Sequence, residues 1–313
     1  MITVEGLNSS LTIRQQSNFD GFPKAAELIE IEGAHALEAS DRAIFNHLLQ
    51  TAHDSGRLVE PDAEWEISLA GLRRASTKHE SNDRLRDSLR RLRRTEVRVT
   101  YVSARTGLPR TMETHLLEFT DTDDVDSPTA TMQFGIPKRL RIVLARSNRW
   151  GRIRCEVSYA MTSKYAIALY EMVCLRANLD RCTEIIEMAR FRELLGVPPK
   201  SYERADNFMR NVIAPALLEV NGLSDVGVQI EMVRKHPRAP AHAVAITWWR
   251  KRGDEFRKAL QERSRPKVGR MARLKGQVEQ LTAERVALVN AEVAEKLEQM
   301  RAQERAKLDD AAE

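Results

Sequence analysis

Hydrophobic and polar residues follow the same order in two stretches of the chain that lie about 120 residues apart. The stretches are Trp65–Val99 and Thr183–Gly222, and each opens with a short strand-like segment followed by a short helix that carries paired apolar residues. A polar break comes next, and then a long helix that begins at Ser81 in the first stretch and at Ser201 in the second. Short helix, turn and long helix in this order are typical of the helix-turn-helix, so the sequence predicts two DNA-binding modules.

The segments around the first repeat predict the rest of a winged helix. Apolar residues at helical spacing predict a helix within His35–Gly56, and Ser163 is a good N-cap for the corresponding helix of the second module. Val97–Ser103 and Met112–Phe119 alternate around a turn and predict a β-hairpin, the wing. A third strand, Thr129–Ile136, follows an acidic loop that should face away from DNA because it would repel phosphate.

A second hairpin is predicted at the end of the second module. Val226–His236 and His242–Arg252 alternate like two strands with a basic loop between them. Pro215 lies inside the preceding long helix, where it predicts a kink or a break into two pieces. Between the modules, Pro137–Trp150 should be helical and Arg152–Ala160 extended.

These elements predict an α+β fold of tandem winged-helix (helix-turn-helix) domains with a C-terminal helical extension. Residues around Arg146–Gly151 would link the two halves and set their spacing. The extension is rich in Ala, Glu, Lys, Arg and Leu, which favours long helix. Its heptad leucines, Leu274, Leu281 and Leu288, are too few for a strong coiled coil, so packing along the domains and a partly exposed arm both stay open. The predicted boundaries are an N-terminal arm at 1–34, a first winged helix at 35–150, a second at 151–252 and the extension at 253–313.

Composition argues against a membrane or secreted protein. The chain has 313 residues, 42% of them hydrophobic, and no apolar run approaches the roughly 18 residues that a membrane span needs. The N-terminus lacks the basic and apolar pattern of a signal peptide. Three cysteines, Cys155, Cys174 and Cys182, without metal-binding spacing fit a reducing compartment, so the expected location is the cytoplasm.

Charge is informative through its distribution, since the formal net charge is only +5. Seven arginines lie between Arg84 and Arg98, opposed only by Asp87 and Glu96. Arginine grips phosphate and reads guanine bidentately, so this concentration on the second helix of a helix-turn-helix predicts DNA contact rather than a merely solvated face. The candidate residues of this helix are Ser81, Asn82, Arg84, Arg86, Arg90, Arg91 and Arg94.

The second module supplies a second set of candidates. In helix-turn-helix docking, the N-terminal residues of the long helix meet base edges and flanking cations meet phosphates. Of the candidates at the turn and helix, about half should touch DNA and the others should be surface residues. Tyr202 has two possible roles, contacting DNA or bracing the turn. The basic wing is expected to contact the DNA backbone or the minor groove. The candidates at the turn and helix are Lys200, Ser201, Tyr202, Arg204, Asn207, Arg210 and Asn211, and those of the wing are Arg234, Lys235 and Arg238.

The sequence contains no motif for catalysis, metal binding or cofactor binding. There is no phosphate-binding loop of the GxxxxGK[ST] type, and the seven histidines are scattered, without the cluster that a DNA-nicking enzyme needs. His236 in the second wing lacks suitably spaced partners for a metal ion. We therefore expect no enzymatic activity, no cofactor and no metal site.

With these elements placed, the chain resembles the iteron-binding plasmid replication initiators, the bacterial Rep proteins with two winged-helix domains. The resemblance covers residues 35–250 and is closest in the second half. There KYAIALYEMV, from Lys164, is similar to the family's first helix, and EMARFRELLGVPPKSYERADNFMRNVIAPALLEVN, from Glu187, is similar to its short helix, turn and long helix. The first half, from Asp41 to Val99, matches more loosely, and the extension is not part of the family's pattern.

The resemblance implies a non-enzymatic initiator that binds direct repeats, called iterons, at a plasmid origin. Such a protein promotes opening of the adjacent duplex and recruits the host replication initiator and the replicative helicase. The resemblance also implies dimers that repress their own promoter, in equilibrium with monomers that initiate replication. The dimer contact would lie in the first domain.

Two other functions stay open. A transcriptional repressor with the same two modules would bind a lone inverted repeat in a promoter, whereas an initiator would bind direct repeats of about two helical turns. A DNA-nicking replication enzyme is disfavoured by the missing histidine cluster.

Overall fold

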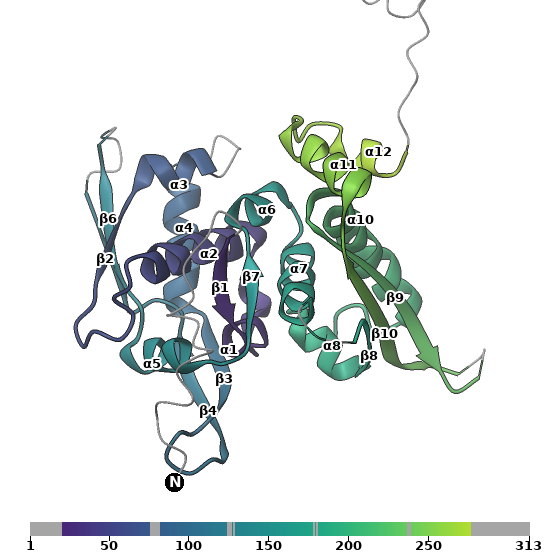
Figure 1. Ribbon diagram of the computed structural model, residues 1–313, viewed down its shortest axis with the longest axis horizontal. Helices are drawn as coiled ribbons and strands as arrows, with labels where there is room; N and C mark the ends of the chain where they lie inside the picture. Colours follow the sequence, from purple (N-terminus) through teal and green to yellow (C-terminus); the bar gives the residue numbers. More distant parts are fainter. Residues whose placement is uncertain are drawn as a thin grey trace, which may run out of the picture. The chain divides into compact units, whose positions relative to one another are not determined.

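The computed structural model describes residues 21–75, 82–123, 127, 129–177, 179, 181–236 and 239–276. The described residues up to Arg270 belong to one compact unit, and those from Met271 belong to a second. Figure 1 labels the helices and strands. No helix in the described ranges is both long and apolar enough to cross a membrane.

The first winged helix begins with α2 (Ala39–Asp54), whose Ile44 and Leu48 point into the core. Glu38 and Asp41 form a capping box that satisfies backbone amides at its start. The other elements are β2 (Trp65–Ser68), α3 (Leu69–Ala75), α4 (Asn82–Arg94), β5 (Phe119–Thr122) and β6 (Thr131–Gly135). The three strands form an antiparallel sheet in the order β2–β6–β5, with the first strand beside the last.

A hairpin is inserted between the long helix of this module and its sheet. Its strands, β3 (Glu96–Val102) and β4 (Pro109–His115), form a two-stranded sheet of their own. Two strands are present as predicted, although the second runs over Pro109–His115 and not Met112–Phe119. The prediction that they are the wing is wrong. The wing is the pair β5 and β6, because β6 is the strand that joins β5 to β2. Alternation along a strand reveals which residues are buried, but it does not identify the partner strand.

The acidic loop is therefore the loop of the first wing itself. Residues 124–126 and 128 of this loop lie outside the described residues, so its predicted orientation away from DNA stays a prediction. Where the loop begins, the carboxylate of Asp123 accepts hydrogen bonds from Thr131 N and Oγ1 at 2.8 and 2.9 Å. These two bonds lower the pKa of Asp123.

The second winged helix repeats the same order without an inserted hairpin. Ser163 caps its first helix as predicted, since its Oγ accepts the amides of Tyr165 and Ala166. The elements are α7 (Lys164–Arg176), β8 (Thr183–Glu187), α8 (Met188–Leu194), α9 (Ala205–Phe208), a π-helical turn (Met209–Ile213), α10 (Ala214–Leu223), β9 (Val226–Arg234) and β10 (Ala241–Arg250). The sheet order β8–β10–β9 is the counterpart of β2–β6–β5.

The long helix of the second module differs from the prediction at its start and in its middle. It begins at Ala205 rather than Ser201, because Lys200 and Tyr202 have φ angles of 62° and 54°, which are left-handed. The π-helical turn separates α9 from α10 just before Pro215, whose missing N–H cannot continue an α-helical ladder. The kink or break that the proline predicts is thus present as the π-helical turn that precedes it.

Several helices and strands lie outside the two winged helices and connect the two modules. β1 (Phe22–Ala25), followed by α1 (Ala26–Ile29), pairs antiparallel with β7 (Trp150–Ile153), which follows α5 (Lys138–Arg146). Residues 21–34, which the sequence assigns to an arm, thus contribute secondary structure. They also contribute Phe22, Leu28 and Ile31 to the core.

The segment that leads into the second module is helical where an extended chain is predicted. Cys155–Ala160 forms α6, and only the preceding Trp150–Ile153 is a strand. Five of the six residues of α6 are buried, so it shows no one-sided apolar stripe and its alternating Cys155, Val157 and Tyr159 read as a strand. From β7 the chain enters α7 through Arg154–Ser163, which contains α6 and is hereafter called the connector.

The two winged helices share one continuous apolar core. Gly151 of β7 allows close packing on α7, since a Cβ there would lie 2.7 Å from Leu175 N. A buried polar network also crosses between the modules. The ammonium group of Lys24 lies 2.8 Å from Glu171 Oε1 and donates to Asn46 Oδ1 at 2.9 Å. The Asn46 amide in turn donates to Glu171 Oε1 at 2.7 Å and to Ser158 Oγ at 3.1 Å.

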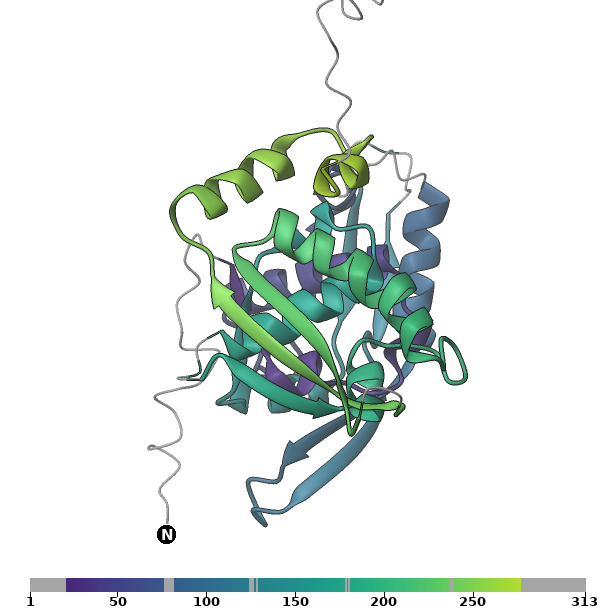
Figure 2. The same cartoon turned by 90° about the vertical axis from the view of Figure 1, so that its right-hand side faces the viewer.

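The beginning of the predicted helical extension is helical, and its first helix packs on the second winged helix. It forms α11 (Gly253–Ser264), which lies beside α10 (Figure 2), and α12 (Arg270–Leu274). Ala259 of α11 is buried. The leucines Leu281 and Leu288 of the weak heptad pattern lie outside the described residues.

Candidate nucleic-acid interface

The helix α4 separates apolar and basic residues on opposite faces. Leu85, Leu89 and Leu92 are buried, as predicted from their spacing. Arginines occupy the rest of the helix surface, and Arg86, Arg90 and Arg94 follow one another about one turn apart, a spacing that suits a row of phosphates. The candidates on this exposed face are Arg84, Arg86, Arg90 and Arg94; Ser81 lies outside the described residues.

Arg91 differs from Arg86 and Arg90 because its guanidinium is paired with a buried carboxylate. Its Nε and Nη2 donate to Asp41 Oδ2 and Oδ1 at 2.7 and 2.9 Å, a bidentate contact with a fully buried carboxylate. The hydrogen bond to Asp41 raises the pKa of Arg91. Because Asp41 also caps α2, Arg91 fastens α4 to the first helix of the module.

Other polar contacts of α4 are weaker or support the turn. Arg86 and Arg90 each lie near an aspartate three residues earlier, at 3.4 Å from Asp83 and 2.5 Å from Asp87, and all four side chains are at least half exposed. Such exposed pairs contribute little and can exchange for phosphate. Asn82 Oδ1 accepts from Arg73 Nη1 at 2.5 Å, which joins α3 to the start of α4.

The turn before α9 is held by an arginine beneath it. Arg192 of α8 donates to the carbonyl oxygens of Ser201 and Tyr202, and its guanidinium lies 4.8 Å from the ring centre of Phe208. Tyr202 packs against the core, so the structure supports the bracing role for its ring. Lys200 is exposed. A rigid turn of this kind presents the helix N-terminus in one orientation.

The polar face of α9 and the π-helical turn carries the remaining helix candidates. Arg204, Arg210 and Asn211 are exposed and Asn207 is half-buried, whereas Phe208 on the opposite side is fully buried. The Asn211 side-chain amide donates to the Asn207 carbonyl at 3.0 Å and also to the Asn207 side chain. This contact orders two amide side chains of the kind that read adenine edges.

The second wing is tied to the same helix. Arg234 of β9 donates to Ala239 O at 2.8 Å across the hairpin, and its Nη2 lies 3.3 Å from Asp206 Oδ1 of α9. Lys235 is exposed at the end of the strand, and Arg238 lies outside the described residues. Wing and helix therefore form one basic edge on the second module.

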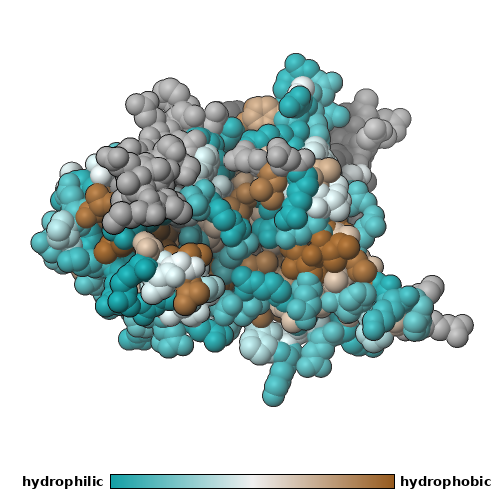
Figure 3. Space-filling view, turned by 60° about the horizontal axis from the view of Figure 1, so that its bottom comes forward, coloured by the Kyte–Doolittle hydropathy of each residue, from teal (hydrophilic) through white to brown (hydrophobic). Residues whose placement is uncertain are grey.

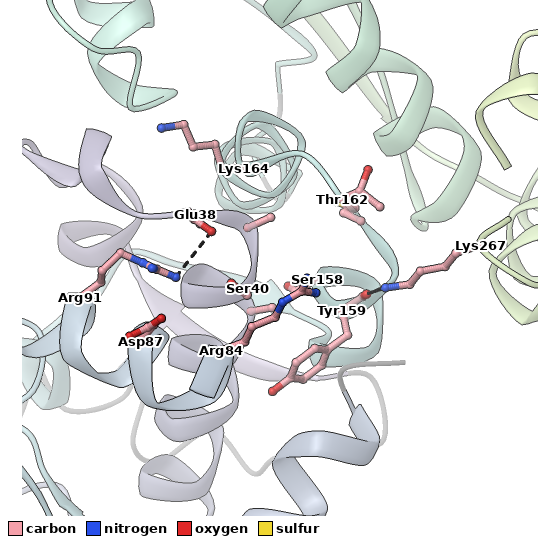
Figure 4. Close-up of a pocket in the computed structure, with 13 residues that line it drawn as sticks. Glu38, Ser40, Arg84, Asp87, Arg91, Ser158, Tyr159, Thr162, Lys164 and Lys267 are labelled. Carbon is pink, nitrogen blue, oxygen red and sulfur yellow. Dashed lines mark hydrogen bonds and ion pairs between the residues drawn. The ribbon is translucent and has the colours of Figure 1, made fainter. Parts of the chain in front are cut away.

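A groove of about 660 Å³ lies where α4, the start of α2, the connector and the start of α7 meet (Figure 4). Its basic lining includes Arg84 and Arg91 from the candidate set, and Lys164 and Lys267, which the sequence analysis missed. The sequence signal for Lys164 is its place in the first turn of α7, where a cation opposes the helix dipole and needs another stabilising contact. Lys164 donates to His35 O at 2.6 Å.

In the described ranges, no three His, Cys, Asp or Glu side chains are placed to hold a metal ion. The surface drawn in Figure 3 is mainly hydrophilic, and its hydrophobic residues gather in separate patches. Val102 and Leu108, on the inserted hairpin and its loop, are 68% and 64% exposed.

Comparison with known proteins assigns both modules to one family. Residues 23–174 match the profile "Initiator Replication protein, WH1", and residues 187–248 match "Initiator Rep protein, WH2". Comparison with curated protein sequences gave no match.

Two solved structures are similar to the chain. The crystal structure of the Pi initiator protein in complex with iteron DNA matches with a TM-score of 0.55 and 14% identity, over 74% of this chain and 98% of that one. A structure of domains 2 and 3 of RctB matches with a TM-score of 0.41 and 13% identity, over 67% of this chain and 80% of that one. The first likeness confirms the tandem winged-helix fold. Together, the two profiles and the shared fold show that the chain belongs to the initiator Rep protein family, whose members are replication initiators.

Proposed function

We propose that this initiator binds direct repeats at a replication origin, with both winged helices of one chain reading a single repeat. The observation that carries the proposal is the presence of two modules of the same strand order in one compact unit, each with a polar or basic long helix exposed. The solved Pi initiator, which shares the fold, is itself in complex with iteron DNA.

The two modules would make different kinds of contact with DNA. Amide side chains and arginines occur together on the exposed face of α9 and its π-helical turn, so the second module supplies most sequence specificity through Arg204, Asn207, Arg210 and Asn211. The exposed face of α4 carries arginines, so the first module mainly contacts phosphates. Arg91 supports this helix rather than contacting DNA, because Asp41 occupies its guanidinium.

Later steps follow from the family. The protein would act in the cytoplasm, promote opening of the origin duplex, recruit the host initiator and the replicative helicase, and repress its own promoter as a dimer. Dimers would form through the first module, where Val102 and Leu108 expose apolar side chains on the inserted hairpin. No step of this scheme needs a catalytic group or a cofactor on the chain.

Footprinting on DNA that flanks the gene tests the proposal. Protection of several direct repeats, each about two helical turns long, is expected for an initiator. Protection of a lone inverted repeat in the promoter, with no protection elsewhere, would instead indicate a transcriptional repressor built from the same modules.

A further inference from the structure

The connector between the two winged helices is held at both ends by the second module. The amides of Thr162 and Ser163 donate to Glu219 Oε2 at 2.9 and 3.1 Å, and Glu219 is buried in α10. At the other end, the guanidinium of Arg154 lies 3.9 Å from Asp225. The α6 part of the connector also packs against α2 of the first module, where Asn46 donates to Ser158 Oγ. Together these contacts oppose the relative motion that adjacent domains commonly show.

The segment that follows the second wing, beginning with α11, packs back against this connector. Phe256 of α11 lies with its ring centre 5.9 Å from the guanidinium of Arg154, and Arg263 lies 3.9 Å from Glu156 of α6. The return is not required to complete the second winged helix, whose last strand is β10. It also lies beyond residue 248, where the match to the family's second domain ends.

Two cations of this segment donate hydrogen bonds to the last carbonyl oxygens of α6. Arg270 is only 4% exposed, and its Nη1 donates to Ala160 O at 2.9 Å. Its Nη2 donates to Arg265 O at 2.8 Å, just beyond the end of α11. Lys267 Nζ donates to Tyr159 O at 2.7 Å. The last carbonyls of a helix lack intrahelical donors and carry partial negative charge, so cations bonded there stabilise α6 and fix its position.

We propose that Gly253–Arg270, hereafter the clasp, fixes the separation of the two DNA-reading helices and thereby determines which spacing of contacts within a repeat the chain accepts. Lys267 and Arg270 are its positioning residues. A rigid connector favours one spacing, because the second contact then needs no further ordering, whereas a loose connector accepts several spacings at lower affinity. This inference rests on the proposed two-module reading of one repeat.

The first test measures the geometry without DNA. Spin labels are attached at Asp83→Cys on α4 and Glu231→Cys on β9, both exposed positions, in a Cys182→Ser background; Cys155 and Cys174 are buried. The distance distribution between the labels should broaden in Lys267→Met and in Lys267→Met/Arg270→Met. It should stay narrow in Arg257→Met, a control on the exposed face of α11. The single variant keeps the buried Arg270, so folding is retained there. A narrow, unchanged distribution in both clasp variants would overturn the proposal.

The second test measures spacing on DNA. Binding is compared for the natural repeat and for repeats with one or two base pairs inserted between the parts that the two modules contact. Insertion should lower the affinity of the parent protein by about 30-fold or more. The double variant should bind the natural repeat about 10-fold more weakly than the parent does, and insertion should lower its affinity by less than about 5-fold. An insertion penalty equal to that of the parent would refute the clasp. A parent protein with no preferred duplex would refute the proposed function instead, and the label distances would still decide on the clasp.

Discussion

At the residue scale, the assignment of specificity rests on a few exposed side chains of the second long helix. Arg204→Ala or Asn207→Ala should weaken specific binding by about 1–3 kcal/mol if either side chain meets a base edge. Lys258→Ala, on the exposed face of α11, serves as the control. Competition between specific and random duplexes measures the effect, and unchanged discrimination in both variants would remove these residues from the base-reading set.

Arginines of α4 should separate into two groups when they are replaced. Arg90→Ala/Arg94→Ala should leave thermal stability unchanged and lower the slope of log affinity against log salt by about 2, since each lost phosphate contact removes nearly one counterion. Arg91→Ala should instead destabilise the fold by about 1–3 kcal/mol, because it leaves the carboxylate of Asp41 buried without its partner. Denaturant melts and salt titrations distinguish the groups. Equal behaviour of the two variants in both assays would contradict the assignment.

His47 should make stability depend on pH. Burial lowers the pKa of this histidine, whose Nδ1 lies 3.2 Å from Tyr159 Oη. The unfolded chain takes up a proton near pH 6.5, the ordinary histidine value, and the folded protein resists it. The folded state is therefore most stable relative to the unfolded chain above about pH 6.5, and this stability is lost as the pH falls from that value through the lowered pKa of the folded protein. Denaturant melts between pH 7.5 and 5 should show that the free energy of unfolding depends less on pH in His47→Gln than in the parent protein. Parallel curves for the two proteins would contradict this role of His47.

At the element scale, the docking of the modules depends on close backbone packing at Gly151. Gly151→Val should destabilise the chain by about 1–3 kcal/mol or more, since the new side chain meets the backbone of Leu175 and Cys174. Gly71→Ala on α3 is a matched control, because its nearest neighbour is Ser68 Cβ at an ordinary 3.6 Å. Thermal melts compare the two, and a Gly151→Val variant as stable as Gly71→Ala would contradict the packing.

Sequence periodicity predicts single elements better than their pairing. The apolar stripe Leu85, Leu89 and Leu92 identifies α4 because one face of that helix is buried and the other is not. The buried α6 has no such contrast, and it reads as a strand. Strand pairing depends on contacts distant in the chain, which is why the wing of the first module is misassigned to the inserted hairpin.

The candidate site shows the same limit. Charge patterning places an arginine-rich face on α4, but it cannot show that Arg91 is paired with Asp41, 50 residues earlier in the chain. The cations that reach the groove, Lys164 and Lys267, come from separate elements and form no local cluster in the sequence. Only the folded chain brings them beside Arg84.

At the scale of the whole molecule, the central claim is that one chain reads one repeat with both winged helices. A shared core and a buried polar network join the two modules in one unit, and the connector held by the clasp would fix their separation, which other helix-turn-helix proteins obtain by dimerising. Either module alone should bind far more weakly, because linkage makes the second contact intramolecular.

Stoichiometry on a single repeat tests this claim most directly. Native mass spectrometry of the full chain with a duplex that carries one repeat should find one chain per duplex, and a hydroxyl-radical footprint should cover about two helical turns of non-palindromic DNA. Two chains bound to a short symmetric site would contradict the account and favour the repressor.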